Sequence, residues 1–327
     1  MEDTKLLEIK NLSVEYHTDD ADIYAINNIN LSMNKGETLG LVGETGAGKT
    51  TVAKSILGIL PQPVSRIVSG EIWYEGEDLL KLKEKDMQKI RGNDIAMIFQ
   101  DPMTSLNPIE TVGFQIYEAI KIHNQDLKKE EAIERAKQML EMVGIPGERY
   151  YDYPHEFSGG MKQRVVIAMA LACNPKLLLA DEPTTALDVT IQAQVLDMMQ
   201  KLRDELKTSV LLITHDFGVV AGFCDVVAVT YAGEIIERGP VDRIFNNPQH
   251  PYTIGLFNSL PHLDSTEPRL KPIKGLMPDP SIKFPGCRFS ERCPYADERC
   301  AAEKPAVTEI EPDHLVKCFR AETEGSV

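Results

Sequence analysis

The 327-residue sequence has no long apolar run, and its N-terminus has no leader-like layout. Its longest uncharged apolar stretch near a helix signal is Val165–Cys173, far short of the ~18 residues that indicate a membrane span. The N-terminal Met-Glu-Asp-Thr-Lys lacks the basic and then apolar pattern of a secretory signal. We therefore expect a cytosolic protein with no membrane segment of its own.

Positive charge is also scarce. The 35 Lys and Arg residues are outnumbered by 50 Asp and Glu residues, which leaves a formal net charge of −15. Because phosphate backbones are bound by clustered Lys and Arg, this balance argues against a nucleic-acid partner. Apolar residues make up 43 % of the chain, enough for a folded core. The length favours one large domain plus an appendage.

Cysteines are few, but four of the six lie in the last 41 residues with the spacing C-x5-C-x6-C-x17-C. In a cytosolic protein such a cluster holds a metal more often than disulfides. Prolines recur from Pro248 to Pro312 and exclude a long helix or a central strand there. We predict a main domain over residues 1–245 and a loop-rich tail over 246–327. The tail cysteines are Cys287, Cys293, Cys300 and Cys318, whereas Cys173 and Cys224 sit in apolar sequence and are expected to be buried.

A glycine-rich stretch matches the phosphate-loop pattern G-x-x-x-x-G-K-[ST], between an apolar strand at 37–42 and a helix starting at Lys49. Backbone N–H groups in such a loop surround phosphate oxygens, and the helix N-terminus adds favourable dipole charge. Lys49 would reach the β- and γ-phosphates, and Thr50 would hold Mg²⁺. The expected nucleotide-binding residues are Gly43, Glu44, Thr45, Gly46, Ala47, Gly48, Lys49, Thr50 and Thr51.

A second stretch, Lys176-Leu-Leu-Leu-Ala-Asp-Glu182, predicts a buried strand that ends in two carboxylates. Asp181 suits Mg²⁺ coordination, and Glu182 is placed to orient or deprotonate an attacking water. Such a pair alone is more often part of a solvated loop. Together with the phosphate loop it predicts nucleotide hydrolysis.

Phe157-Ser-Gly-Gly-Met-Lys-Gln-Arg164 precedes an apolar helix that Ser158 can cap, and its glycines let a ligand approach the exposed N–H groups. With these motifs in this order, the sequence resembles the ATP-binding-cassette (ABC) ATPases. The resemblance implies an α/β P-loop NTPase cassette, with a RecA-like core, an antiparallel β subdomain and a helical subdomain at about 101–157. The loop-rich four-cysteine tail would follow it.

The resemblance also assigns roles to single residues. Gln100 matches the Q-loop, which contacts Mg²⁺ and senses the membrane partner, and His215 matches the switch histidine at the γ-phosphate. Tyr16 would stack on adenine, although a strand aromatic in the core is the alternative. Helices such as 130–143 would dock a membrane channel, or simply cover the surface. The signature would comprise Ser158, Gly159 and Gly160, with Phe157 and Met161 replacing the ends of the generic Leu-Ser-Gly-Gly-Gln, and Ala186-Leu-Asp188 resembles the D-loop.

The tail carries the resemblance further. Tyr231–Gly239, His250–Thr253, Asn258–Pro261 and the cysteine cluster are similar to ATPase subunits of bacterial di- and oligopeptide importers, a group that includes nickel importers. Peptide cargo is favoured because peptide members dominate the group. The resemblance implies ATP and Mg²⁺ as cofactors and a peripheral location at the cytoplasmic face of the cell membrane. It implies transmembrane permease subunits, a second ATPase (a paralogue, giving a heterodimer) and, indirectly, an extracytoplasmic peptide-binding protein as partners.

For the four tail cysteines we favour a [4Fe-4S] cluster, which needs four thiolates and tolerates irregular spacing. Structural zinc usually shows tighter C-x₂₋₄-C pairs, and free thiols or disulfides are a third possibility. Either metal would serve to fold the tail, so we expect loss of Cys287 and Cys318 to leave phosphate-loop binding intact. An ATPase of iron–sulfur cluster assembly is the alternative function. A coiled-coil repair ATPase is disfavoured because only 109 positions separate Lys49 from Ser158.

Overall fold

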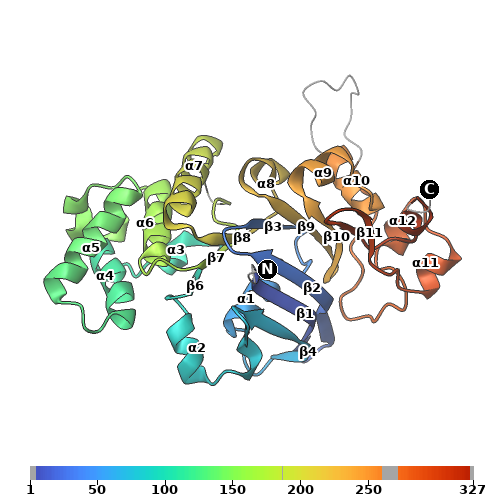
Figure 1. Ribbon diagram of the computed structural model, residues 1–327, viewed down its shortest axis with the longest axis horizontal. Helices are drawn as coiled ribbons and strands as arrows, with labels where there is room; N and C mark the ends of the chain where they lie inside the picture. Colours follow the sequence, from blue (N-terminus) through green and yellow to red (C-terminus); the bar gives the residue numbers. More distant parts are fainter. Residues whose placement is uncertain (1–4, 186, 260–271, 325–327) are drawn as a thin grey trace. The chain divides into compact units, whose positions relative to one another are not determined.

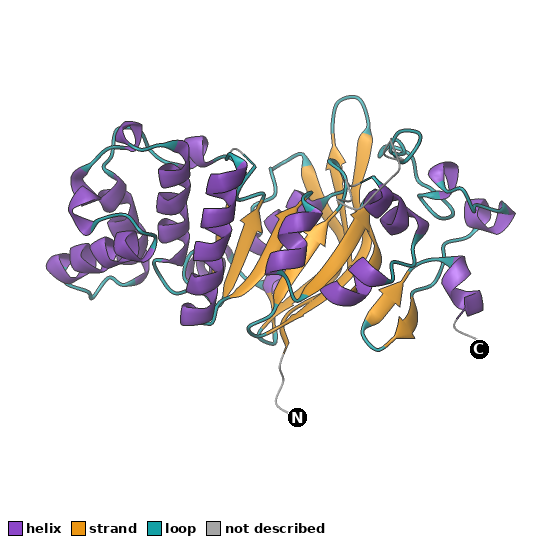
Figure 2. Cartoon of the chain, turned by 90° about the horizontal axis from the view of Figure 1, so that it is seen from above, coloured by secondary structure: helices purple, strands orange, loops and turns teal. Residues whose placement is uncertain are grey.

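The computed structural model describes residues 5–185, 187–259 and 272–324, and they form two compact units. Leu7–Ser32, Leu39–Asp78 and Thr214–Val327 make up the phosphate-loop unit. Met1–Leu6, Met33–Thr38 and Leu79–Ile213 make up the helical unit. Both units combine helices with strands (Figure 2), which confirms the predicted α/β class.

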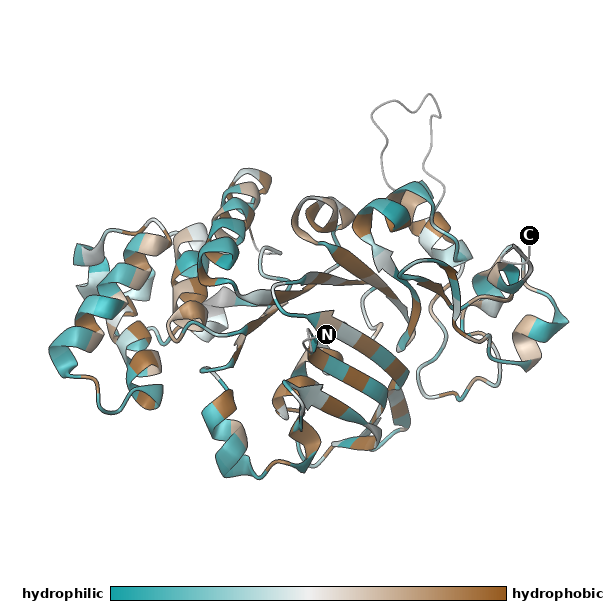
Figure 3. Cartoon of the chain, in the orientation of Figure 1, coloured by the Kyte–Doolittle hydropathy of each residue, from teal (hydrophilic) through white to brown (hydrophobic). Residues whose placement is uncertain are grey.

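The phosphate-loop unit contains an antiparallel sheet in the order β2-β1-β4-β5. Its register pairs Leu7 with Tyr74 and Ile9 with Ile72 across β1 and β4. Hydrophobic and hydrophilic residues alternate along these strands (Figure 3), so one face is buried and the other is not. This is the predicted antiparallel β subdomain. Its strands are β1 (Lys5–His17), β2 (Asp22–Asn34), β4 (Ser65–Tyr74) and β5 (Glu77–Asp78).

A second set of strands in this unit runs in the order β11-β12-β10-β9-β3. The fully buried β3 (Thr38–Val42) is parallel to β9 (Val226–Tyr231), while β10 (Glu234–Pro240) is antiparallel to β9. The tail supplies β12 (His314–Val316), which pairs with β10, and then β11 (Thr308–Glu311). The proline-rich tail therefore supplies the last two strands of this set, with β12 next to β10 and β11 outermost.

The tail packs onto the core of the phosphate-loop unit through aromatic rings. Tyr231 of β9, Tyr252 and Phe289 have ring centroids 4.6 to 5.5 Å apart, and all three are buried. The predicted boundary at 245/246 lies within the helix α9. The helices of this unit are α1 (Lys49–Leu57), α8 (Phe217–Phe223), α9 (Val241–Asn246), α10 (Pro251–Asn258), η4 (Ser290–Arg292), α11 (Glu298–Ala302) and α12 (Phe319–Glu324).

The helical unit has three parallel strands in the order β8-β7-β6, with Leu179 of β7 opposite Met97 and Leu211. The strands are β6 (Ile95–Ile98), β7 (Leu177–Asp181) and β8 (Ser209–Thr214). Helices α4 and α5 lie side by side next to α6 (Figure 1), and buried Ala132, Ala136 and Leu140 form the inner stripe of α5. The helices are η1 (Leu79–Lys81), α2 (Glu84–Ile90), α3 (Pro102–Ser105), α4 (Val112–His123), α5 (Lys129–Met142), η2 (Gly147–Tyr151), η3 (Pro154–Glu156), α6 (Gly159–Leu171) and α7 (Val189–Leu206). Among the described residues, no helix has the length and apolar character needed to cross a membrane.

Candidate functional site

The phosphate loop joins the buried strand β3 to helix α1, and two of its glycines leave no room for a side chain. Gly43 and Gly48 have φ angles of 154° and 90°. A Cβ at Gly43 would lie 2.2 Å from the Thr230 carbonyl oxygen, and one at Gly48 would lie 2.5 Å from that of Ala25. The loop is therefore seated tightly against β2 and β9, and this contact fixes its course.

Lys49 begins α1, and its side chain crosses the loop. The Lys49 Nζ donates hydrogen bonds to the carbonyl oxygens of Gly43 at 2.8 Å and Glu44 at 3.0 Å. The residue is only 6 % exposed. The ammonium is thus held within the loop, where this motif binds phosphate oxygens.

Two predicted residues outside the loop also lie in the phosphate-loop unit. The Tyr16 hydroxyl is 3.1 Å from Thr51 Oγ1, and the ring is partly exposed, so Tyr16 lies beside the first turn of α1 rather than in the core. His215 follows β8 and is exposed. The next residue, Asp216, caps α8 by accepting a hydrogen bond from Gly218 N at 2.8 Å.

The predicted acid pair lies in the helical unit, where β7 ends. Asp181 is buried, and Glu182 adopts a left-handed φ of 47° while its N–H donates to the Ile213 carbonyl at 2.8 Å. A non-glycine residue in this region costs about 1–3 kcal/mol, and such strain concentrates at functional sites. The positive φ of Glu182 is therefore consistent with its predicted place in a functional site.

The Glu182 carboxylate is oriented by two donors. Gln100 Nε2 and Thr185 Oγ1 each donate to Glu182 Oε2 at 2.9 Å. Gln100 follows β6, so this bond brings together two residues that the sequence analysis assigned to the same reaction. Thr185 was not among the predicted residues, and no motif signal marks it.

The signature glycines have different surroundings. Ser158 caps α6 by accepting a hydrogen bond from Met161 N at 3.4 Å. A Cβ at Gly159 would meet nothing within 4 Å, whereas one at Gly160 would lie 2.5 Å from Ile191 Cγ2 of α7. Gly159 thus leaves an open approach to the helix N-terminus, and Gly160 allows α6 and α7 to pack closely. Asp188 caps α7 through Ile191 N at 3.0 Å, and Ala186 of the predicted D-loop lies outside the described residues.

Arg149 in η2, which the sequence analysis missed, holds the signature loop. Its guanidinium lies 4.1 Å from the Phe157 ring centroid and donates to the Glu156 carbonyl at 3.2 Å. It also donates to the Met161 sulfur at 3.7 Å and pairs with Asp152 at 2.6 Å. Phe157 and Met161, the two departures from the generic signature, are therefore both contacts of one arginine.

The four tail cysteines are partly buried thiols, and none forms a disulfide. Cys287 N–H donates to the Cys300 carbonyl at 2.8 Å, which joins two of the segments. Burial raises the pKa of all four thiols, that of Cys287 to about 11, and neighbouring cysteines raise the pKa of Cys287, Cys293 and Cys300 further. Over the described ranges no group of three or more His, Cys, Asp or Glu is placed to hold a metal ion, so the metal site stays a prediction.

A phosphate loop after a buried strand, a strained acid at the end of another strand and a capped glycine pair define an ABC-type ATPase. A family model described as ABC transporter matches residues 26–185, and one described as oligopeptide/dipeptide transporter, C-terminal region, matches residues 236–300. The chain belongs to the ATP-binding proteins of the ABC transporter family, which bind ATP with Mg²⁺ and hydrolyse it.

Within this family, the chain is similar to named peptide transport ATP-binding proteins. It is 49 % identical to the dipeptide transport ATP-binding protein DppD of Lactococcus lactis, over 98 % of this chain and 92 % of the relative. It is 50 % identical to the oligopeptide transport ATP-binding protein OppD of Bacillus subtilis, over 97 % and 89 %. Among solved structures, the dimeric ATP-binding cassette MJ0796 bound to ADP and Pi matches with a TM-score of 0.65 and 29 % identity, covering 72 % of this chain and 99 % of that one. These matches confirm the cassette fold.

Proposed function

We propose that this chain is the ATP-hydrolysing motor subunit of a bacterial importer of dipeptides and oligopeptides. The 2.9 Å hydrogen bond between Gln100 and Glu182 carries the proposal. This bond joins Glu182, the predicted base, to Gln100. The residue before Gln100, Phe99, lines an apolar groove of the helical unit. Cargo is assigned from the names of the relatives and from the match to the peptide-transporter C-terminal region. Nickel import and iron–sulfur cluster assembly have no such support.

In this proposal the nucleotide-site residues divide by task. Residues Gly43 to Thr51 bind the phosphates, Tyr16 stacks on adenine, and His215 contacts the γ-phosphate. The hydroxyl of Thr50, the amide oxygen of Gln100 and the carboxylate of Asp181 are oxygen ligands of the kind Mg²⁺ prefers. Since the Gln100 amide nitrogen donates to Glu182, its amide oxygen is left for the metal.

Glu182 is the proposed general base. Donors from Gln100 and Thr185 fix the orientation of its carboxylate, and Lys49 is held within the phosphate loop. Phosphoryl transfer depends mainly on positioning and on charge stabilisation. The bound Mg²⁺ would neutralise developing charge on the phosphates, while Glu182 would remove a proton from the attacking water.

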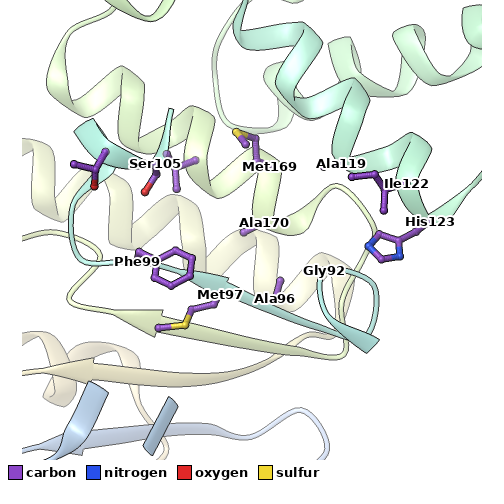
Figure 4. A pocket seen from close by; sticks show the side chains of 12 residues that line it. Gly92, Ala96, Met97, Phe99, Ser105, Ala119, Ile122, His123, Met169 and Ala170 are labelled. Carbon is purple, nitrogen blue, oxygen red and sulfur yellow. The ribbon is translucent and has the colours of Figure 1, made fainter. Parts of the chain in front are cut away.

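The permease partner would dock in an apolar groove of about 580 Å³ in the helical unit (Figure 4). Its lining includes Met97 and Phe99 at the end of β6, Ile122 and His123 of α4, and Met169 of α6. Phe99 is 44 % exposed and Ile122 is 60 % exposed, although both are large and apolar. Because Phe99 directly precedes Gln100, a permease helix in this groove would act on the residue that orients the base.

A second ATPase would complete the site. Gly159 leaves the N-terminus of α6 open, and the related cassette MJ0796 was solved as a dimer. We assign the partner to a paralogue, giving a heterodimer whose signature residues Ser158, Gly159 and Gly160, with Asp188, face the other subunit's phosphates. Residues 1–245 form the ATPase domain in this scheme. The assembly lies at the cytoplasmic face of the membrane, where a peptide-binding protein on the other side delivers cargo to the permeases.

A [4Fe-4S] cluster is the proposed resident of the tail, with zinc as the alternative. The support is the four-cysteine spacing and the Cys287–Cys300 backbone bond. The raised pKa values mean that binding would release protons. Iron and zinc content of anaerobically purified full chain tests this assignment, and absence of both metals would contradict it.

The transport assignment is tested in a strain that lacks this gene. Wild-type chain should restore uptake of a labelled dipeptide, and Glu182→Gln should not, although it should still bind ATP. Labelled Ni²⁺ serves as the matched cargo. Restoration of nickel uptake without peptide uptake would overturn the peptide assignment but not the motor assignment.

A further inference from the structure

An arginine of the cysteine-rich tail contacts the phosphate loop. Arg292 in η4 donates from Nη1 to both carboxylate oxygens of Glu44, at 3.2 and 3.1 Å. The same nitrogen is 3.3 Å from the Tyr231 hydroxyl, and Nε donates to the Lys274 carbonyl at 3.1 Å. The Arg292 side chain is only 7 % exposed. Its guanidinium is therefore fixed on three sides, with Glu44 as its carboxylate partner.

Glu44 is held at its main chain as well. Its N–H donates to the hydroxyl of the buried Tyr252 at 3.1 Å, and its carbonyl accepts from Lys49 Nζ at 3.0 Å. Tyr252, Tyr231 and Phe289 form one aromatic cluster beneath Arg292. A continuous chain of contacts thus runs from Arg292 through Glu44 to Lys49.

The positive charge of Arg292 also neutralises the Glu44 carboxylate. Glu44 is an acid within a loop that must receive the negative phosphates of ATP, so its carboxylate opposes binding unless it is neutralised. Arg292 supplies the positive charge from a nearly buried position, where screening by water is weak. Cys287 and Cys293 lie on either side of this arginine in the sequence.

We propose that Arg292 is a positioning residue for the phosphate loop. By holding and neutralising Glu44, it keeps the loop and Lys49 ready for nucleotide, so the four-cysteine tail sets the affinity of the ATPase for ATP. This inference goes beyond the proposed transport function and depends only on ATP binding. It replaces the expectation that the tail acts on its own stability alone.

The test measures the Kd for Mg·ATP and the Tm of the full chain carrying Arg292→Gln, with Arg288→Gln as the matched control. Arg288 is a tail arginine of similar burial, 4 % exposed at its side chain, and it pairs with Glu234 rather than with the loop. Arg292→Gln should raise the Kd about three- to tenfold, the scale of one charged hydrogen-bonding contact. Arg288→Gln should lower the Tm about as much as Arg292→Gln does, and it should leave the Kd within about twofold of wild type.

Two further variants separate positioning from folding. Glu44→Gln in the Arg292→Gln chain should restore much of the affinity, because the uncompensated charge is gone, and Arg292→Lys should retain part of it. An unchanged Kd in Arg292→Gln, or equal losses of affinity in Arg292→Gln and Arg288→Gln, would overturn the inference. Failure of the wild-type chain to support peptide uptake would overturn the proposed function instead, and these binding measurements would be unaffected.

Discussion

Two glycine-rich loops of this chain are each held by one arginine that lies outside the motif, but the two anchors differ in kind. Arg292 reaches the phosphate loop from a tail segment 248 positions downstream and binds a carboxylate. Arg149 lies eight positions before Phe157 and holds the signature loop through a ring, a sulfur and a carbonyl. The phosphate loop therefore depends on a distant segment, whereas the signature loop depends on its own neighbourhood.

This difference suggests that nucleotide binding and pairing with a second ATPase are controlled separately. A long-range ion pair is sensitive to anything that shifts the tail, while a local stack moves as one piece with its helix. We expect the affinity for nucleotide to depend on the position of the tail. We expect pairing with a second ATPase to depend on the contacts at the start of α6. The predictions below test this separation.

The largest expected effect comes from Glu182→Gln. Hydrolysis should fall at least about 100-fold, because the amide cannot accept the proton from water. Binding of Mg·ATP should remain, since Glu182 is not part of the phosphate loop. ATPase rate and Kd measured on the same preparation check this, and Thr185→Val, which removes one donor to the carboxylate, should show a smaller loss. Undiminished hydrolysis in Glu182→Gln would show that another group is the base.

Arg149→Ala should lower the ATPase rate of the assembled importer about tenfold, the scale of a lost cation–π contact plus hydrogen bonds. The Kd of the isolated chain for Mg·ATP should not change, because the phosphate loop has a different anchor. Lys137→Ala is the matched control, since Lys137 also lies over a ring of the helical unit, that of Tyr151 at 5.9 Å. A loss of nucleotide affinity in Arg149→Ala would show that the two loops are not separately held.

The contiguous motifs were the part of the site that sequence could predict. The phosphate loop, Asp181 and Glu182 each depend on a strand and the residues that follow it, and the structure has them in that setting. Gln100 could be assigned only through the family resemblance, and its contact with Glu182 across 82 positions depends on the pairing of β6 with β7. Local pattern therefore located the chemistry, and sheet order brought its parts together.

The anchors were beyond sequence reasoning for a physical reason. An arginine carries no periodic signal, and its partner is decided by how the chain folds back. Arg292 meets Glu44 because β12 and the aromatic cluster fasten the tail to β9 and β10. Arg149 meets Phe157 because η2 and η3 turn the chain onto itself. The division at 245/246 was drawn from proline content, which marks irregular structure but does not report what that structure packs against.

Replacing Cys287 and Cys318 together with Ser should reduce metal content and raise the Kd for Mg·ATP about two- to fivefold through Arg292. Elemental analysis and nucleotide titration check the two effects on one sample. Cys224→Ser is the matched control, because Cys224 is a partly buried cysteine of the same unit outside the tail. Loss of metal with an unchanged Kd would restore the simpler view in which the tail only stabilises itself.

The smallest expected effect is a loss of folding stability at acid pH, and it should act on the anchor of the phosphate loop. Burial lowers the pKa of His250 to about 4, with Lys317 adding repulsion and Glu237 opposing it. The unfolded chain takes up this proton near pH 6.5, so stability that is fully present above that pH is lost as the pH falls towards 4.

Going from pH 7 to pH 5 should lower the free energy of unfolding by about 2 kcal/mol. His250→Asn, which can still cap Tyr252 N, should flatten that dependence on pH in urea unfolding. His155→Asn, at an exposed position, should keep the wild-type slope. Because Tyr252 holds Glu44, acid should weaken the phosphate-loop anchor, and a pH slope that survives in His250→Asn would place the sensitivity elsewhere.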